Sequence, residues 1–139
     1  MKGNHQFSIA VHMMTCLGAS RDGMPSSILA TSVNTSPSFI RRTLAKLSKA
    51  KLVKTTVGKS GTCSLNKDAK RISMLDIYKA VEAPGAFSIH QYPAQKACDI
   101  SCKIKSSMTR VLDKTQTAME ESLKKVSLAE VIADVQKQL

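Results

Sequence analysis

The feature that most constrains the fold is a change of period within the stretch NTSPSFIRRTLAKLSKAKLVKTTVGKSGTCSL. Ser36 is a good helix N-cap, and Pro37 suits the first helical position, where its missing N–H is not needed. Rotation by about 100° per residue then places Ile40, Leu44 and Leu47 on one side of a helix. The opposite side collects polar and basic residues: Ser38, Arg41, Arg42 and Lys49. We expect the first side to pack and the second to reach outward.

A short helix is expected just before this one. The segment SSILATSV follows the turn SRDGMP, has Ser26 or Ser27 as its N-cap, and stops at NTS. Two short helices separated by three or four residues form a helix-turn-helix. After Leu52 the segments LVKTTV and TCSL are short and β-branched, and they flank the glycine-bounded tip GKSG. This pattern predicts a hairpin, which after a helix-turn-helix is a wing.

Further helices are expected on both sides of this motif. Residues 5–18 carry apolar residues at helical spacing, and Gly18 is the expected stop. The segment ISMLDIYKAVE has Ser73 and Asp76 in capping-box spacing. We therefore predict a mainly α (α+β) chain, in which residues 1–83 form a winged helix-turn-helix domain with a two-stranded wing.

Residues 84–139 are predicted to form a loop, a long dimerisation helix and a short C-terminal helix. Residues 84–97 contain two prolines and no sustained period. The last helix is expected to start with a capping box at Ser127 and Glu130 and to pack back. The long helix carries an apolar stripe about 100° wide, which is more than so small a domain can cover, so another subunit is expected there. The stripe consists of Ile100, Ile104, Met108, Val111, Thr115, Ala118 and Met119.

Positive charge is concentrated in the middle of the chain. The net charge is +11, and residues 38–71 hold ten lysines and arginines against one acid, Asp68. Solvated surfaces normally mix both signs. A local anion-binding site is therefore favoured over a solubilising face, although charge alone does not separate nucleic acid from an acidic membrane.

The sequence shows no sign of a membrane span, a signal peptide or a disulfide scaffold, and this indicates the expected cellular compartment. No run approaches the roughly 18 apolar residues of a membrane span, and the N-terminal residues do not form a signal peptide. Four cysteines are too few and too scattered for a disulfide scaffold. We expect a cytoplasmic protein with reduced thiols and no membrane partner.

The segments SFIRRTLAKLSKAKLVKTTVGKSG and ISMLDIYKAVE resemble the BadM/IscR/NsrR/CymR family of bacterial winged-helix transcriptional regulators, and look closest to its YwnA-like branch. The most specific part is the spacing between recognition helix, glycine-tipped wing and the helix start Ile-Ser-x-x-Asp-Ile. The resemblance implies a homodimer that binds double-stranded DNA at a partly palindromic operator, with dimerisation through the long helix at Ile100, Ile104, Met108, Val111, Thr115 and Met119.

In this family the recognition helix enters the major groove, and the wing tip reaches the minor groove or phosphates. Ser38, Phe39, Arg41 and Arg42 match the family's groove-facing positions. The full set expected on the recognition helix is Ser36, Ser38, Phe39, Arg41, Arg42, Lys46 and Lys49. The set expected on the wing is Lys54, Gly58, Lys59, Ser60, Gly61 and Thr62.

Two departures from the family pattern change the expected readout. Arg41 stands where relatives often have an acid, and arginine prefers bidentate contact with guanine. Val57 replaces the usual minor-groove arginine, with Lys59 as its likeliest substitute. We therefore expect a different preferred operator and weaker minor-groove readout, with phosphate contacts intact.

Some relatives bind an iron–sulfur cluster through three cysteines and one further ligand near the start of the long helix. This chain has Cys98 and Cys102 there, Lys105 where a ligand histidine can occur, and His90 in the loop. These residues make an incomplete site unless the other subunit contributes. No metal or cofactor is therefore expected, although an iron–sulfur cluster or zinc stays open as an alternative.

Thiol sensing is a second alternative for this region. Cys98 lies near a helix N-terminus with Lys96 and Lys103 close in sequence, and these features favour a thiolate. Cys102 could resolve an oxidised Cys98 if the helix end frays. The other interpretation is that both are small interface residues without a redox role, and the effector is unknown.

Two other function classes are less well supported. A winged-helix adaptor could hold an acidic protein on its basic face, but it would not need a recognition helix and a wing in register. An enzyme is not expected, because no nucleophile and base recur in a known motif and GKSGT lacks the spacing of a P-loop. The leading hypothesis is a sequence-specific regulator, acting as a repressor.

Overall fold

The structure, a computed structural model, describes residues 5–56 and 61–139. The chain divides into two compact units, Met1–Ala83 with Leu123–Leu139, and Pro84–Ser122. The division expected from the sequence places all of residues 84–139 in one part. By its contacts, however, the C-terminal helix groups with the N-terminal unit.

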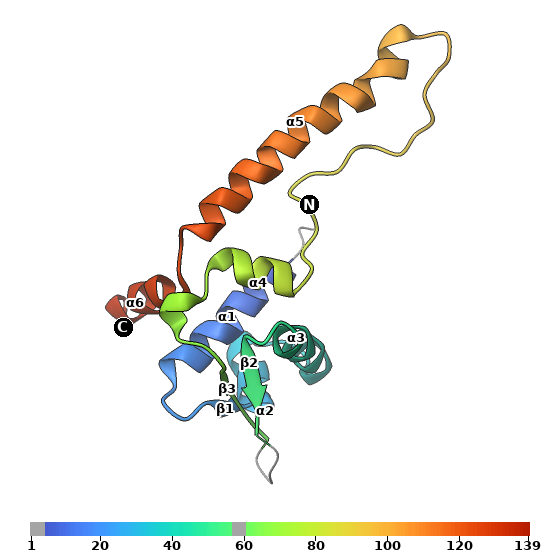
Figure 1. The fold of residues 1–139 in the computed structure, drawn as a ribbon. Coiled ribbons are helices and arrows are strands. Elements are labelled where there is room, and N and C mark those ends of the chain that lie inside the picture. Colours follow the sequence, from blue (N-terminus) through green and yellow to red (C-terminus); the bar gives the residue numbers. More distant parts are fainter. Residues whose placement is uncertain (1–4, 57–60) are drawn as a thin grey trace. The chain divides into compact units, whose positions relative to one another are not determined.

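The first unit contains five α-helices, one short 3-10 helix and a small sheet among the residues described (Figure 1). The sheet has the strand order β1-β3-β2 and is antiparallel throughout. The elements are α1 (Gln6–Ala19), β1 (Met24–Pro25), α2 (Ser26–Val33), α3 (Pro37–Lys49), β2 (Val53–Thr55), β3 (Thr62–Leu65), the short 3-10 helix η1 (Ala69–Arg71), α4 (Met74–Ala80) and α6 (Leu128–Lys137).

The predicted hairpin is confirmed, but the sheet has a third strand. Val53 pairs with Leu65 across the hairpin, and Met24 pairs with Cys63 on the other edge of β3. Pro25 ends β1 at this edge, where its missing N–H removes no bond from a central ladder. The predicted two-stranded wing is thus confirmed, and β1, which precedes α2 in the chain, adds a third strand to its sheet.

The ends of α1 and α2 differ from the sequence prediction. Gly18 is not a stop, because α1 continues to Ala19; a Cβ at Gly18 would lie 2.2 Å from Ile132 Cδ1, so the glycine instead allows α6 to approach closely. Helix α2 has Pro25 at its N-cap position and no side-chain cap, so neither Ser26 nor Ser27 caps it. It ends at Asn34, whose left-handed φ of 64° turns the chain toward α3.

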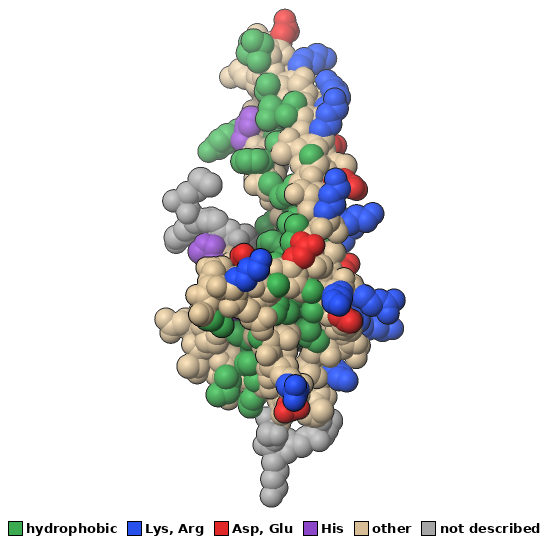
Figure 2. Space-filling view, turned by 90° about the vertical axis from the view of Figure 1, so that its left-hand side faces the viewer, with side chains coloured by type: hydrophobic (Ala, Val, Ile, Leu, Met, Phe, Trp, Pro, Cys, Tyr) green, Lys and Arg blue, Asp and Glu red, His purple; other side chains and the backbone are tan. Residues whose placement is uncertain are grey.

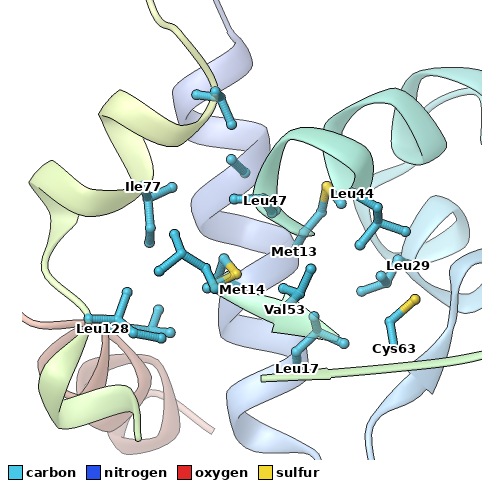
Figure 3. Packing of buried hydrophobic residues seen from close by; sticks show 14 of the residues in the cluster. Met13, Met14, Leu17, Leu29, Leu44, Leu47, Val53, Cys63, Ile77 and Leu128 are labelled. Atoms are coloured by element: carbon cyan, nitrogen blue, oxygen red, sulfur yellow. The ribbon is translucent and has the colours of Figure 1, made fainter. Parts of the chain in front are cut away.

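The predicted apolar face of α3 is confirmed as part of the core. Ile40 and Leu47 are fully buried and Leu44 is 8 % exposed. Figure 3 shows Leu44 and Leu47 beside Met13 of α1. Complete burial of one such side chain contributes about 1.5–3 kcal/mol. This packing fixes the orientation of α3 about its own axis.

The C-terminal helix is joined to the first unit by backbone pairing. The Met74 N–H donates to the Val126 carbonyl (2.8 Å), and the Leu128 N–H donates to the Ile72 carbonyl (2.7 Å). Ser73 forms the predicted capping box with Asp76, and Ser127 accepts from the Glu130 N–H at 3.1 Å. Leu128 is fully buried, so the last helix packs back as expected.

The second unit consists of the predicted loop and most of the long helix α5 (Asp99–Lys124). The Ala86 N–H donates to Gln116 Oε1 at 3.0 Å, which holds the start of the loop against the helix. No residue of α5, which lies wholly within the described range 61–139, is buried. No helix of the described ranges is both long and apolar enough to cross a bilayer.

Gly23 is predicted to be essential for the attachment of β1. Its φ is +78°, and an added Cβ would lie 2.1 Å from the Cys63 carbonyl oxygen. Gly61 has a φ of +49° with no atom within 4 Å of such a Cβ, so it is a matched control for backbone conformation alone. Gly23→Ala should lower the free energy of unfolding by at least about 2 kcal/mol, and Gly61→Ala by about 1 kcal/mol. Urea unfolding measures both, and equal losses would contradict the close approach.

Candidate nucleic-acid interface

Helix α3 starts with the cap that the sequence predicts. Ser36 Oγ accepts a hydrogen bond from the Phe39 N–H at 3.2 Å, and Pro37 occupies the first helical turn. The side of α3 that points away from the core carries four exposed polar or basic residues: Ser38, Arg41, Arg42 and Lys49. The helix therefore packs through one side and carries basic side chains on the other.

The two arginines of α3 are held by different neighbours. Arg41 Nη2 donates to Ser38 Oγ at 3.4 Å. The Arg42 guanidinium carbon lies 5.6 Å from the centroid of the half-buried Phe39 ring, which is a cation–π arrangement. These contacts restrict the two side chains and leave guanidinium N–H groups free to bind an anion or a base edge.

A hollow of about 330 Å³ lies between α3 and the wing. Arg41 lines it from α3, and Thr55 and Gly61 line it from the two arms of the hairpin. Its remaining lining residues are Ser26, Leu44, Ala45, Ser48 and Cys63. The recognition helix and the wing thus border a single concave surface, which we call the α3–wing hollow.

Three polar residues of the α3–wing hollow were not predicted as site residues. Ser48 follows Arg41 by seven positions, and this helical spacing could have identified it. Ser26 was instead expected to be a cap. Thr55 has no local signal, because its position at the hollow depends on the pairing of β2 with β3.

The described part of the wing brings Gly61 and Thr62 next to β2. The Thr56 N–H and Oγ1 both donate to the Thr62 carbonyl, at 2.9 and 3.2 Å. Lys54 is exposed, but alternation along the strand places it on the opposite face from Thr55. The predicted positions Val57, Gly58, Lys59 and Ser60 lie outside the described residues.

Lys46 differs from the other basic residues of α3. It is half-buried, and its Nζ donates to the Val81 carbonyl at 3.4 Å, on the side of the helix that faces α4. Lys49 is exposed in the last turn. Binding of DNA by Lys46 stays a prediction, and it would require release of the bond to Val81.

The candidate sensor cysteines lie at the start of α5. Cys98 directly precedes the helix, and its Sγ accepts the Ser101 N–H at 3.4 Å, as a capping side chain does. The Cys102 N–H donates to the Cys98 carbonyl at 3.1 Å, and both thiols are free and exposed. His90 lies beside Tyr92, with ring centroids 6.3 Å apart, and Lys105 donates to the Tyr92 carbonyl.

The fold and sequence match transcriptional regulators. The chain is 33% identical over 130 residues to YwnA of Bacillus subtilis, whose name describes it as an HTH-type transcriptional regulator; the match covers 93% of this chain and 96% of YwnA. A solved structure described as a DNA-binding protein is 30% identical, with a TM-score of 0.74, and the match covers 91% of this chain and 98% of that one. IscR of T. potens, at 21% identity, shares the fold with a TM-score of 0.73 over 100% of this chain and 92% of its own.

The model of the Rrf2 family, described as an iron-dependent transcriptional regulator, matches residues 4–134. The residues present do not fit an iron–sulfur cluster or zinc held by one chain. Within residues 5–56 and 61–139, no group of three or more His, Cys, Asp or Glu side chains could hold a metal ion. Cys98 and Cys102 supply two thiols, whereas such centres require four ligands.

The family resemblance read from the recognition helix, the wing and the start of α4 is confirmed, and so is the expectation of a regulator without enzymatic activity. The arrangement of α2, α3 and the β1-β3-β2 sheet is that of a winged helix, with exposed arginines on its recognition helix. The chain belongs to the Rrf2 family of transcriptional regulators.

Proposed function

We propose that this regulator is a homodimeric, sequence-specific repressor. Helix α3 would read the major groove and the wing would contact the adjacent backbone, on each half of a partly palindromic operator. A protein that occupies an operator inside a promoter blocks access for other proteins. Repression is therefore the expected output.

The observation that carries this proposal is the exposed face of α3 beside the α3–wing hollow. Arg41 and Arg42 are held in defined positions, and their planar donor groups suit guanine O6 and N7 as well as phosphate oxygens. The wing borders the same concave surface as Arg41. An adaptor that binds an acidic protein would not require both elements to border one surface.

The homodimer is supported by the unpaired apolar side of α5. Ile100 is 73 % exposed and Val111 is 52 % exposed on this helix. The upper part of Figure 2 shows hydrophobic side chains in one strip and Lys and Arg side chains in a neighbouring strip. Helix α5 has 26 residues, so it is about 39 Å long and offers an extended seam for a second copy. Two winged-helix heads would then meet two half-sites.

A thiol input at the start of α5 is part of this proposal. A disulfide between Cys98 and Cys102 would require distortion of the turn that holds the Cys102 N–H against the Cys98 carbonyl. Oxidation by a peroxide would thereby alter the first turn of the helix proposed to dimerise. The oxidation state of the two thiols would thereby affect dimerisation, and no bound metal would be needed.

Replacing Arg41 and Arg42 together with Ala should lower affinity for the protein's own promoter region at least about 30-fold, because each lost base contact costs about 1–3 kcal/mol. A gel-shift assay with a scrambled DNA competitor measures this loss. Lys125→Ala with Lys137→Ala removes the same charge outside α3 and the wing, and it should retain most of the specific binding. Unchanged specific binding in the arginine variant would refute the proposal, and weak binding without preference in the unmodified protein would favour the adaptor.

Replacing Ile104 and Val111 with Glu should convert a dimer into a monomer, because unpaired carboxylates would be buried in the seam. Sedimentation measures the mass, and the same samples should lose operator affinity. Ser106→Glu with Thr117→Glu adds the same charge to the opposite side of α5 and should leave the dimer intact. If the variant with both Ile104→Glu and Val111→Glu still forms dimers, the interface does not lie on this side of α5.

A further inference from the structure

A second concave site lies in the first unit, bordered by α1, α2 and α6. It has a volume of about 540 Å³, and its described lining residues differ from those of the α3–wing hollow. Volumes of roughly 300–1,000 Å³ are typical of small-molecule sites. We call this site the α1–α6 cavity.

The described walls of the α1–α6 cavity are mostly apolar. Its walls include Val11 and Ala19 from α1, and Val131 and Val135 from α6. The hydroxyl of Thr15, which also lines it, is already bonded to the Val11 carbonyl at 2.7 Å. Among the described residues that line it, none is Lys, Arg, Asp or Glu, in a chain whose net charge is +11. Such a lining favours a neutral ligand with a small apolar body.

One end of the cavity carries a thiol connected to an imidazole. Cys16 Sγ lies 3.3 Å from Ser32 Oγ, and Ser32 Oγ lies 3.0 Å from His12 Nε2. His12 and Cys16 are one turn apart on α1, and Ser32 reaches them from α2. In the tautomer with hydrogen on Nδ1, the thiol donates to Ser32 and Ser32 donates to His12. This chain of bonds connects the thiol proton with a base.

We propose that the α1–α6 cavity captures a small apolar electrophile with a carbon–carbon double bond conjugated to a carbonyl, such as an enone or a quinone. The Cys16 sulfur forms a bond to the β-carbon, and the π bond of the alkene breaks as its electron pair moves toward the carbonyl. The thiol proton passes through Ser32 to His12 and then to the α-carbon or carbonyl oxygen. The addition consumes no oxidant and releases no leaving group.

The adduct would be linked to DNA binding through α2. Ser32 lies in the last turn of α2, two residues before Asn34, which turns the chain into α3. Alkylation removes the Cys16 proton that bonds to Ser32 and places new atoms beside α2. The recognition helix would then shift relative to the wing, which makes Cys16 an input to the promoter binding proposed above. This last step rests on the proposed function, whereas the capture itself does not.

The reaction is tested with N-ethylmaleimide as the probe, and the rate of modification at each cysteine is followed by peptide mass spectrometry. Cys98 is exposed and has no neighbouring base among its hydrogen-bond partners in the described residues, so it serves as an internal reference. Cys16 should react at least about 100-fold faster than Cys98, the low end of what a positioned base contributes. A maleimide with a carboxylate side chain should lose this preference at Cys16.

Two variants distinguish the contribution of the base to the modification rate from the contribution of the cavity wall. His12→Ala should reduce the rate at Cys16 to that at Cys98 or below, without changing Cys98. Val135→Glu, at a residue already 40 % exposed, should slow the apolar probe at Cys16 alone by charging the wall. Equal rates at Cys16 and Cys98 in the unmodified protein, or no effect of His12→Ala, would overturn the proposal. So would oxidation of Cys16 by hydrogen peroxide without reaction toward the maleimide.

The link to DNA is measured separately in Cys98→Ser/Cys102→Ser protein. N-ethylmaleimide should release this protein from its promoter fragment, and the further change Cys16→Ala should abolish the release. Fast alkylation of Cys16 without release would retain the capture site and refute its regulatory role. Absence of promoter binding in the unmodified protein would refute the proposed function, while the modification rates still decide the capture.

Discussion

Burial of the apolar side of α3 in the core that it shares with α1, α2 and α4 is the interaction on which the rest of the structure depends. Ile40 and Leu47 are fully buried, and Met13 and Met14 of α1 are fully buried with them. Because a helix has one rotation at which these side chains are covered, the same contact directs Arg41 and Arg42 outward. The buried side and the exposed basic side of this helix are therefore two results of one packing arrangement.

The sheet and the C-terminal helix support this arrangement from other directions. Strand β1 holds the wing next to the start of α2, through the pairing of Met24 with Cys63. The pairing of residues 72–74 with 126–128 adds α6 to the other side of α1. Helix α1 thus contacts α2, β3 and α6, and the α1–α6 cavity is lined by residues of α1, α2 and α6.

Local signals predicted most of the recognition helix, because its determinants are close in sequence. Ser36 and Pro37 define its start, and Ile40 and Leu47 define its buried side. Long-range contacts account for what was missed. Strand β1 has two residues and exists only through its pairing with β3, and Gly18 was read as a helix stop although its role depends on Ile132, far along the chain.

The same reasoning applies to the candidate sites. Arg41 and Arg42 were predicted from helical rotation, but the bond from Lys46 to the Val81 carbonyl could not be, because it joins α3 to the end of α4. The cluster of His12, Cys16 and Ser32 was not predicted either. His12 and Cys16 lie within the helical pattern of residues 5–18, and only the position of α2 brings Ser32 to them.

The pairing of residues 72–74 with 126–128 has a consequence for how this architecture can vary. Residues 84–122 leave the first unit and return to it, so they form an excursion closed at both ends by a folded base. For a flexible segment, doubling the length of such a closed loop costs only about 0.6 kcal/mol of chain entropy. The excursion can therefore be lengthened or shortened by whole helical turns at little expense to the base. Evolution or design could change the length of this excursion without rebuilding the unit to which it is joined.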